Sequence, residues 1–332
     1  RDDVESRGLG DVYKRQELQC EFTGNSFHLH TYMGVYEIRD RDEAVSIMVD
    51  KANIAADTIK NNYDCCVAYY DEHLLEISIE QRRLLGEFEP ALQNDEFVMY
   101  LQPQVKRDGA AKGAEALVRW VHPSRGILTP YAFIDILENA GLIYKLDLYI
   151  WEKAAQKLAE WKEKGYGSYH ISVNISTKDF YIIDIYETFT GLINKYGIAA
   201  SNLHLEITET TLMTDFEKNM NIIHKLQGVG FRVEIDDFGS GYSSLNMLKD
   251  ISADVLKIDM GFLRKSENEV KGQDILESII TLAGKIGMDV ITEGVETKKQ
   301  LDMLTMMGCH EFQGYYFSKP VPVSEFEEKY LV

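Results

Sequence analysis

The chain has 332 residues, 45% of them hydrophobic and 27% charged, which suffices for one large domain and a smaller piece. Its formal net charge of -19 would repel a nucleic-acid backbone, which argues against a polymeric nucleic acid as partner. The four cysteines lack C-x-x-C spacing and no run of about 18 apolar residues exists, so the sequence predicts a reduced, cytoplasmic chain without a cysteine-zinc site, a disulfide framework or a membrane span.

The N-terminal quarter of the chain is predicted to form a small unit behind a tail. Residues 1–16 mix charges with glycine and show no periodicity, so they are interpreted as a disordered tail or a foreign segment. Residues 17–81 are short for an independent fold. Their patterns predict strands over Phe27–Ile38 and Cys65–Tyr70 and helices over Asp40–Lys60 and Ile77–Leu92.

From Phe97 onward, short strands alternate with helices. The predicted strands are Phe97–Gln102, Ala114–Trp120, Tyr169–Ile175, Leu203–Thr208, Phe231–Asp236, Asp254–Ile258, Asp289–Thr292 and His310–Gln313. The predicted helices are Ala132–Asn139, Leu146–Lys164, Asp179–Lys195, Asp215–Gly228, Glu269–Gly287 and Lys298–Met307. This α/β alternation favours a TIM-like (β/α)8 barrel, with a doubly wound open sheet as the alternative.

Most of these strands have one apolar face and one polar face, because alternate side chains point in opposite directions. In Tyr169–Ile175 the polar set is His170, Ser172 and Asn174, and in Leu203–Thr208 it is His204, Glu206 and Thr208. Later strands add Glu234 and Asp236, and then Lys257 and Asp259. In a barrel this face points inward, where polar groups are costly unless they bind a ligand or each other. Pairing of Lys257 with Glu234 is one such alternative.

The sequence Glu234–Ser244 ends a strand in two adjacent carboxylates followed by a glycine-rich loop. Two carboxylates at a strand end repel each other unless a cation lies between them. The simpler interpretation is that Asp236 caps a turn and Asp237 is solvated. The recurrence of acidic strand ends elsewhere in the chain favours the cation.

Six oxygen-bearing residues are predicted to converge at the strand ends, as candidate ligands for two Mg²⁺ or Mn²⁺ ions: Glu115, Asn174, Glu206, Asp236, Asp237 and Glu293. Asp236 is the candidate bridge, and Lys257 could orient an attacking water or offset phosphoryl charge. Arg119 shares a strand face with Glu115. It could contact phosphate or, equally, form a salt bridge with one of these carboxylates. This set indicates metal-assisted phosphoester hydrolysis.

Several motifs over residues 82–332 resemble those of EAL-domain cyclic-di-GMP phosphodiesterases. They include Glu115-Ala116-Leu117, Ser172-Val173-Asn174, Glu206-Ile207-Thr208-Glu209, Asp236-Asp237-Phe238-Gly239, Leu256-Lys257-Ile258-Asp259, Glu293-Gly294-Val295-Glu296 and Gln313-Gly314-Tyr315. The resemblance implies hydrolysis of cyclic-di-GMP to linear pGpG and a barrel whose first strand is antiparallel. Ser240 replaces a usual threonine, and Glu234 stands where a small apolar residue is usual.

The resemblance also implies roles for individual residues. It assigns the six oxygen-bearing residues as metal ligands and gives catalytic roles to Lys257, near the attacking water, and to Glu293, Asp237 and Glu209. Glu209 would steady the loop Asp237–Ser244. Positions near the substrate are Gln102, Leu117, Arg119, Asp259 and Gln313.

Residues 17–81 resemble the C-terminal half of a GGDEF domain, but the Gly-Gly-Asp-Glu-Phe signature is absent, so cyclase activity is not expected. The chain is therefore interpreted as part of a longer GGDEF–EAL protein, with an upstream sensor or membrane domain in the parent and a homodimer through the barrel.

Two functions compete at this stage. The first is an active phosphodiesterase, and the second is a receptor module that binds cyclic-di-GMP without turnover. The complete ligand set favours the enzyme, because a receptor has no need of water-activating groups. A structural barrel without ligand leaves the polar interior unexplained.

Overall fold

The computed structural model describes residues 31–60, 66–239, 251–261 and 271–331, and the backbone alone of 20–22, 25–27 and 269–270. The predicted tail, residues 1–16, and the loop residues Ser240–Ser244 lie outside this part of the chain. The chain divides into two compact units, Arg1–Glu87 and Phe88–Val332. Among the helices of the described ranges, none combines the length and apolar character needed to cross a bilayer.

The N-terminal unit contains a βαβ arrangement. Strands β3 (Met33–Val35) and β4 (Val67–Tyr69) pair in parallel, and helix α1 (Val45–Asp57) connects them. A Cβ on Gly34 would lie 1.7 Å from the carbonyl oxygen of Ala52, so α1 packs directly on the backbone of β3. A short hairpin, β1 (Cys20–Phe22) and β2 (Asn25–Phe27), precedes it, and α2 (Glu72–Gln93) follows. Of the predicted strand Phe27–Ile38, Phe27 ends β2 and Met33–Val35 form β3, whereas residues 28–30 lie outside the described part of the chain.

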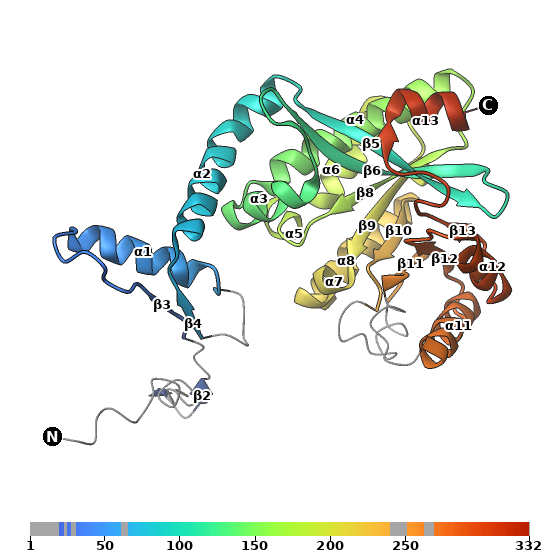
Figure 1. Cartoon of the computed structure of the whole chain (residues 1–332). Helices are drawn as coiled ribbons and strands as arrows, with labels where there is room; N and C mark the ends of the chain where they lie inside the picture. Colours follow the sequence, from blue (N-terminus) through green and yellow to red (C-terminus); the bar gives the residue numbers. More distant parts are fainter. Residues whose placement is uncertain are drawn as a thin grey trace. The chain divides into compact units, whose positions relative to one another are not determined.

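The C-terminal unit is an eight-stranded closed barrel (Figure 1). Its strands are β5 (Phe97–Lys106), β6 (Ala111–His122), β8 (His170–Ile175), β9 (Leu203–Thr208), β10 (Arg232–Asp236), β11 (Val255–Asp259), β12 (Asp289–Glu293) and β13 (Glu311–Phe312). Strand β5 pairs with both β6 and β13, which closes the sheet. The open-sheet alternative is therefore wrong.

Strand β5 runs antiparallel to both of its neighbours, whereas β6 and β8 to β13 are parallel to one another. This confirms the antiparallel first strand expected from the resemblance. Two short strands extend the edges: β7 (Gly126–Leu128) pairs with β6, and β14 (Val321–Pro322) pairs with β5. All the long parallel strands thus end at the same rim of the barrel, where active sites of this architecture lie.

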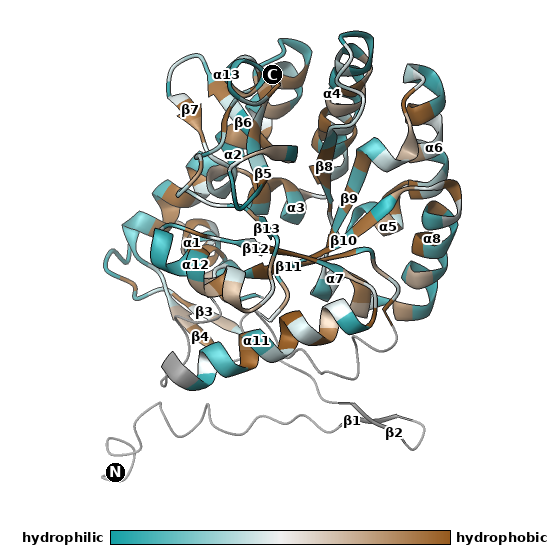
Figure 2. Cartoon of the chain, turned by 90° about the vertical axis from the view of Figure 1, so that its right-hand side faces the viewer, coloured by the Kyte–Doolittle hydropathy of each residue, from teal (hydrophilic) through white to brown (hydrophobic). Residues whose placement is uncertain are grey.

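Helices with mixed hydrophobic and hydrophilic surfaces surround the strands (Figure 2). They are α3 (Ile134–Ala140), α4 (Ile143–Glu163), α5 (Asp179–Ile182), α6 (Ile185–Tyr196), α7 (Glu209–Thr214), α8 (Phe216–Val229), α11 (Glu269–Lys285), α12 (Lys298–Met306) and α13 (Val323–Tyr330), with short 3-10 turns at Pro130–Ala132 and Ala200–Asn202. The outward strand residues are fully covered: Ile171, Val173, Leu205 and Val233 have 0% exposure. The predicted division into an apolar outer face and a polar inner face is confirmed.

Capping residues explain where the predicted helices were wrong. The helix predicted over Asp179–Lys195 is two helices, because Ile183 is extended and the Asp184 side chain accepts a hydrogen bond from the backbone N–H of Glu187. Helix α7 was not predicted; the Thr208 side chain caps it at the end of β9. Helix α13 was not predicted either.

Gly113 on β6 offers a test of the packing inside the barrel. A Cβ at this position would lie 2.4 Å from the imidazole of His170 on the neighbouring strand. We expect Gly113→Ala to lower the free energy of unfolding by about 1–3 kcal/mol, measured by denaturant titration. Gly191→Ala is the control, because a Cβ there meets no atom within 4 Å on helix α6. The control should be neutral or slightly stabilising. Equal destabilisation by both would contradict the packing described.

Candidate active site

Strand register brings the polar residues of the barrel interior to similar heights. Asn174 on β8 is the register partner of Glu206 on β9, and Asp236 on β10 is the partner of Thr208. On the closing side, Glu115 on β6 pairs with Gln102 on β5. The side chains therefore meet near the carboxyl ends of the parallel strands.

Lys257 on β11 lies at the centre of this group. Its Nζ is 2.8 Å from Glu293 Oε1, 2.9 Å from Glu206 Oε2, 3.2 Å from Asp236 Oδ1 and 3.5 Å from Glu115 Oε2. Lys257 is 1% exposed and Glu206 is fully buried. We call these four carboxylates and the ammonium the lysine ring. One positive charge faces four acidic side chains, so the ring carries an excess of negative charge in a buried space.

This excess shifts the ionisation of the ring. Burial opposes the charged form of Lys257, but Asp236, Glu115 and the other ring carboxylates outweigh it and raise its pKa well above the usual value. Burial raises the pKa of Glu293 to about 8, with Lys257 opposing and Asp236 adding to the shift. Burial and Glu115 likewise raise the pKa of Glu206. The carboxylates thus lack sufficient positive charge among the described side chains.

Several polar atoms of the ring also lack hydrogen-bond partners among the described residues. The ring contacts are within ion-pair distance, yet within the described ranges both oxygens of Glu206, Oδ1 of Asp236, Oε1 of Glu293 and Nζ of Lys257 have no partner in hydrogen-bond geometry. Buried polar atoms are nearly always hydrogen-bonded or bound to an ion. Unsatisfied carboxylate oxygens fit a hard divalent cation, so the donor set is compatible with the metals expected from the sequence.

Two amide side chains hold Glu115 in place, and a third amide contacts one of them. Asn174 Nδ2 donates to Glu115 Oε1 at 3.1 Å, and Gln313 Nε2 donates to Glu115 Oε2. Gln313 also donates to Gln102 Oε1 at 3.3 Å, and Gln102 donates to the carbonyl of Ser318 at 3.3 Å. The predicted residues Gln102, Asn174 and Gln313 therefore do adjoin the ring.

The remaining predicted residues lie outside the ring contacts. Asp237 is exposed and has a left-handed φ of 55°, which turns the chain away from β10. Partial burial, followed by the charge of Asp236, raises its pKa. Asp259 is exposed and accepts a hydrogen bond from the backbone of Gly261 at 2.5 Å. Leu117 is half-buried, and Glu209 is the first residue of α7.

Arg119 pairs with none of the ring carboxylates at ion-pair distance. Its Nη1 donates to the carbonyl of Val118 at 2.8 Å, and its Cζ is 5.4 Å from the centre of the Tyr100 ring. Burial lowers its pKa. Of the two alternatives for this residue, a salt bridge to the ring is thus not formed, and phosphate contact stays a prediction.

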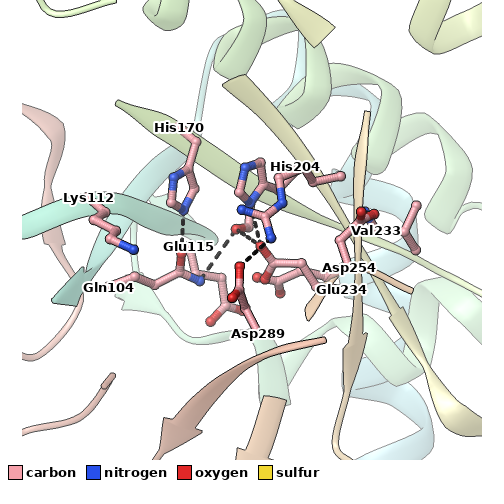
Figure 3. A network of polar contacts seen from close by, with 12 residues as sticks. Gln104, Lys112, Glu115, His170, His204, Val233, Glu234, Asp254 and Asp289 are labelled. Atoms are coloured by element: carbon pink, nitrogen blue, oxygen red, sulfur yellow. Dashed lines mark hydrogen bonds and ion pairs between the residues drawn. The ribbon is translucent and has the colours of Figure 1, made fainter. Parts of the chain in front are cut away.

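A second polar network lies deeper in the barrel, toward the amino ends of the strands (Figure 3). His204 Nδ1 is 2.5 Å from Glu234 Oε1, and Ser172 donates to the same oxygen at 3.2 Å. His170 Nε2 is 2.7 Å from Gln104 Oε1. Pairing of Lys257 with Glu234 was wrong, since the ion pairs of Lys257 go to the four ring carboxylates.

This network was not assigned a function from the sequence. Strand parity had placed His170, His204 and Glu234 on the inward face, and the unusual charge of Glu234 was the available signal. Burial opposes ionisation of Glu234, but its contact with His204 lowers the pKa to about 2. Burial, followed by the charge of His204, lowers the pKa of His170 well below its usual value.

Comparison with known proteins identifies close structural relatives. A family model described as the EAL domain matches residues 86–320. The bifunctional diguanylate cyclase/cyclic di-GMP phosphodiesterase MucR of Pseudomonas aeruginosa is 32% identical over 272 residues, covering 82% of this chain and 39% of MucR. The cyclic di-GMP phosphodiesterase PdeR of Escherichia coli is 33% identical over 240 residues, covering 72% of this chain and 36% of PdeR.

Among solved structures, the PaMucR phosphodiesterase in complex with c-di-GMP superposes with a TM-score of 0.70 at 33% identity, covering 74% of this chain and 99% of that chain. The chain spans about two fifths of the length of the curated relatives it matches.

The lysine ring predicts a metal-dependent stability for one variant. Lys257→Met leaves four carboxylates without their cation, two of them buried, so in excess chelator the free energy of unfolding should fall by about 3–5 kcal/mol. Mg²⁺ should restore more stability to Lys257→Met than to the unmodified chain, as measured by thermal unfolding. The control is Lys195→Met, which breaks only the exposed pair with Glu152 and should change little. Loss of equal size in both variants would contradict the central place of Lys257.

Proposed function

The chain belongs to the EAL domain family, and from this membership and the lysine ring we propose that it hydrolyses cyclic-di-GMP to linear pGpG. The observation that carries the proposal is the ring itself, with Lys257 Nζ within 3.5 Å of four carboxylates at the carboxyl ends of the strands. In barrels of this type, that rim carries the active site. The related PaMucR phosphodiesterase has been solved with c-di-GMP.

EAL phosphodiesterases are metal-dependent. The residues proposed to hold two metals are Glu115, Asn174, Glu206, Asp236, Asp237 and Glu293. Their donors are all oxygen, which favours Mg²⁺ or Mn²⁺ over zinc. Such ions, when bound, lower the pKa of a coordinated water and neutralise charge on a phosphoryl group. The unsatisfied oxygens of Glu206 and Asp236 support this assignment.

The side chains of the chain supply the rest of the chemistry. Lys257 stays protonated at neutral pH because its pKa is raised, so it can offset negative charge that develops on the phosphoryl oxygens. Gln102, Gln313 and Glu115 form a connected rim that fixes the geometry beside the scissile group. Attack of water on phosphorus breaks the bond to the ribose 3′ oxygen, which takes a proton, and leaves a 5′ phosphate on pGpG.

The alternative is a receptor that binds cyclic-di-GMP without turnover. A receptor requires contacts to guanine and phosphate but has no use for a buried ammonium among four carboxylates. Arg119, Leu117, Asp259 and Glu209 keep their proposed roles near the substrate and the loop in either case. The lysine ring favours the enzyme.

The N-terminal unit is proposed to be a fragment of a GGDEF domain. Its β3–α1–β4 arrangement is supporting evidence, and its sequence lacks the cyclase signature. The proposed domains are residues 17–81 and 82–332, close to the limits of the family match and of the two compact units. Homodimerisation through the barrel and an upstream sensor or membrane domain stay predictions.

Product analysis tests the proposed reaction. Incubation of the chain with cyclic-di-GMP and Mg²⁺ or Mn²⁺ should yield pGpG, and excess chelator should abolish the product. Ca²⁺ should support little turnover, because it prefers more ligands at longer distances. Binding of cyclic-di-GMP without product in every metal would establish the receptor instead.

Two ring variants separate the role of Lys257 from that of the metal ligands. Lys257→Ala should lower kcat on the order of 10²–10³-fold, whereas its metal affinity should be at least that of the unmodified chain. Asp236→Asn should lose metal affinity and turnover together. Calorimetric titration with Mn²⁺ beside a turnover assay measures both quantities, with Lys195→Ala as the surface control. If Lys257→Ala lost metal as completely as Asp236→Asn, this division of roles would be wrong.

A further inference from the structure

The segment between β13 and β14, residues 313–319, is tied to the lysine ring, and we call it the rim turn. Its first residue, Gln313, donates a hydrogen bond to Glu115 of the ring. Near its end, the carbonyl oxygen of Ser318 accepts a hydrogen bond from the side chain of Gln102 at 3.3 Å. Both ends of the rim turn are therefore held beside the carboxylates of the proposed active site.

The middle of the rim turn packs on the backbone that follows β12. The N–H of Tyr316 donates to the carbonyl oxygen of Val295 at 2.9 Å, and the N–H of Val295 donates to the carbonyl oxygen of Gln313 at 3.2 Å. A Cβ on Gly314 would lie 2.2 Å from the Val295 carbonyl oxygen, so the two backbones are in direct contact. The rim turn is therefore held in its middle as well as at its ends.

The rim turn carries an exposed tyrosine with a lysine beside its ring. Tyr315 is 58% exposed, and Nζ of Lys319 lies 5.3 Å from the centre of the tyrosine ring. Lys319 is exposed too, and among the residues that the structure describes none has a carboxylate within ion-pair distance of its ammonium group. An aromatic surface and a positive charge are thus both open to a ligand at the rim.

Arg119 on β6 adds a second cation near Tyr315. Burial lowers the pKa of the Arg119 guanidinium, and the nearby phenol groups of Tyr100 and Tyr315 act in the opposite direction. Arg119 Cζ also lies 5.4 Å from the centre of the Tyr100 ring. Two cations and two tyrosines are therefore grouped at the rim of a chain whose net charge is -19. Such a group attracts phosphate through its charge and a planar base through its aromatic rings.

We propose that Tyr315 and Lys319 bind the half of cyclic-di-GMP that is not cleaved, a role that rests on the proposed hydrolysis at the lysine ring. The dinucleotide has two phosphates and two guanines. While one phosphate occupies the ring, the ammonium of Lys319, together with Arg119, contacts the other phosphate through charge-assisted hydrogen bonds. The ring of Tyr315 stacks on a guanine. The rim turn thus determines affinity for the dinucleotide, whereas the lysine ring performs the chemistry.

Equilibrium binding in Ca²⁺ separates recognition from turnover. Ca²⁺ binds oxygen ligands but should support little hydrolysis, so calorimetric titration of the full chain with cyclic-di-GMP then measures affinity alone. Tyr315→Ala should raise Kd by roughly 10–100-fold, because it removes the stacking surface. Lys319→Met should raise Kd by about 3–10-fold, since its phosphate contact is exposed and screened by salt. Tyr315→Phe keeps the ring and Lys319→Arg keeps the charge, so both should retain most of the affinity.

The chain offers matched controls for both substitutions. Tyr181 is 53% exposed and has Lys218 Nζ 4.5 Å from its ring centre. It lies on α5, which follows β8, a strand that pairs with neither β5 nor β13. Lys195 Nζ lies 5.0 Å from the ring centre of Tyr196 on α6. Tyr181→Ala and Lys195→Met remove the same groups elsewhere on the surface, so both should bind cyclic-di-GMP like the unmodified chain.

Turnover in Mg²⁺ provides a second measurement. Tyr315→Ala and Lys319→Met should raise KM for cyclic-di-GMP and change kcat by less than about threefold, because they remove binding energy without removing a group of the lysine ring. The simple diester bis-p-nitrophenyl phosphate has neither a second phosphate nor a guanine, so kcat/KM for it should not change. The affinity for Mn²⁺ should also equal that of the unmodified chain.

Three outcomes would overturn the proposal. One is an unchanged affinity for cyclic-di-GMP in both Tyr315→Ala and Lys319→Met. Another is weaker Mn²⁺ binding, or an equal loss of activity toward the simple diester, which would show that the two side chains support the lysine ring instead of contacting substrate. The third is the absence of cyclic-di-GMP binding by the unmodified chain, which would also remove the proposed function, whereas the first two outcomes leave that function standing.

Discussion

The active-site end of the barrel depends on one buried ammonium group. Lys257 is held by four carboxylates from four different strands, β6, β9, β10 and β12. Removing either sign of charge leaves the other uncompensated in a low-dielectric interior, which costs several kcal/mol. Because the ring carries more negative than positive charge, it is complete only with additional cations. The excess of negative charge destabilises the ring when no metal is bound, and the same excess creates affinity for metal cations.

The sequence predicted the barrel well because strand alternation is a local property. Eight strands and their inward faces followed from the period of two, and Glu115, Glu206 and Asp236 converge as predicted. Helix boundaries were less predictable, because a single cap at Asp184 divides one helix into α5 and α6. A single side-chain hydrogen bond at a cap can end one helix and begin another. The periodicity of hydrophobic residues does not reveal such a hydrogen bond.

The central position of Lys257 could not be derived from the pattern. Parity placed its side chain inward, but a four-carbon stem can reach several partners. The choice among Glu234 and the ring carboxylates depends on height along the barrel axis. Glu234 lies two residues before Asp236 on β10, one layer lower, where His204 and Ser172 are in reach. Register between strands, which no single strand encodes, decided the pairing.

The interior of this barrel therefore consists of two polar layers in place of the usual apolar filling. In the upper layer the donors are oxygens that surround an ammonium group, and in the lower layer two imidazoles stack beside a carboxylate. Strands β9 and β10 each contribute to both layers, through His204 and Glu206 and through Glu234 and Asp236. A shift of β9 by two residues would exchange Glu206 for His204 in the upper layer, and thus an oxygen for a nitrogen. The register that assembles the lysine ring therefore also decides which side chains contact Glu234 in the lower layer.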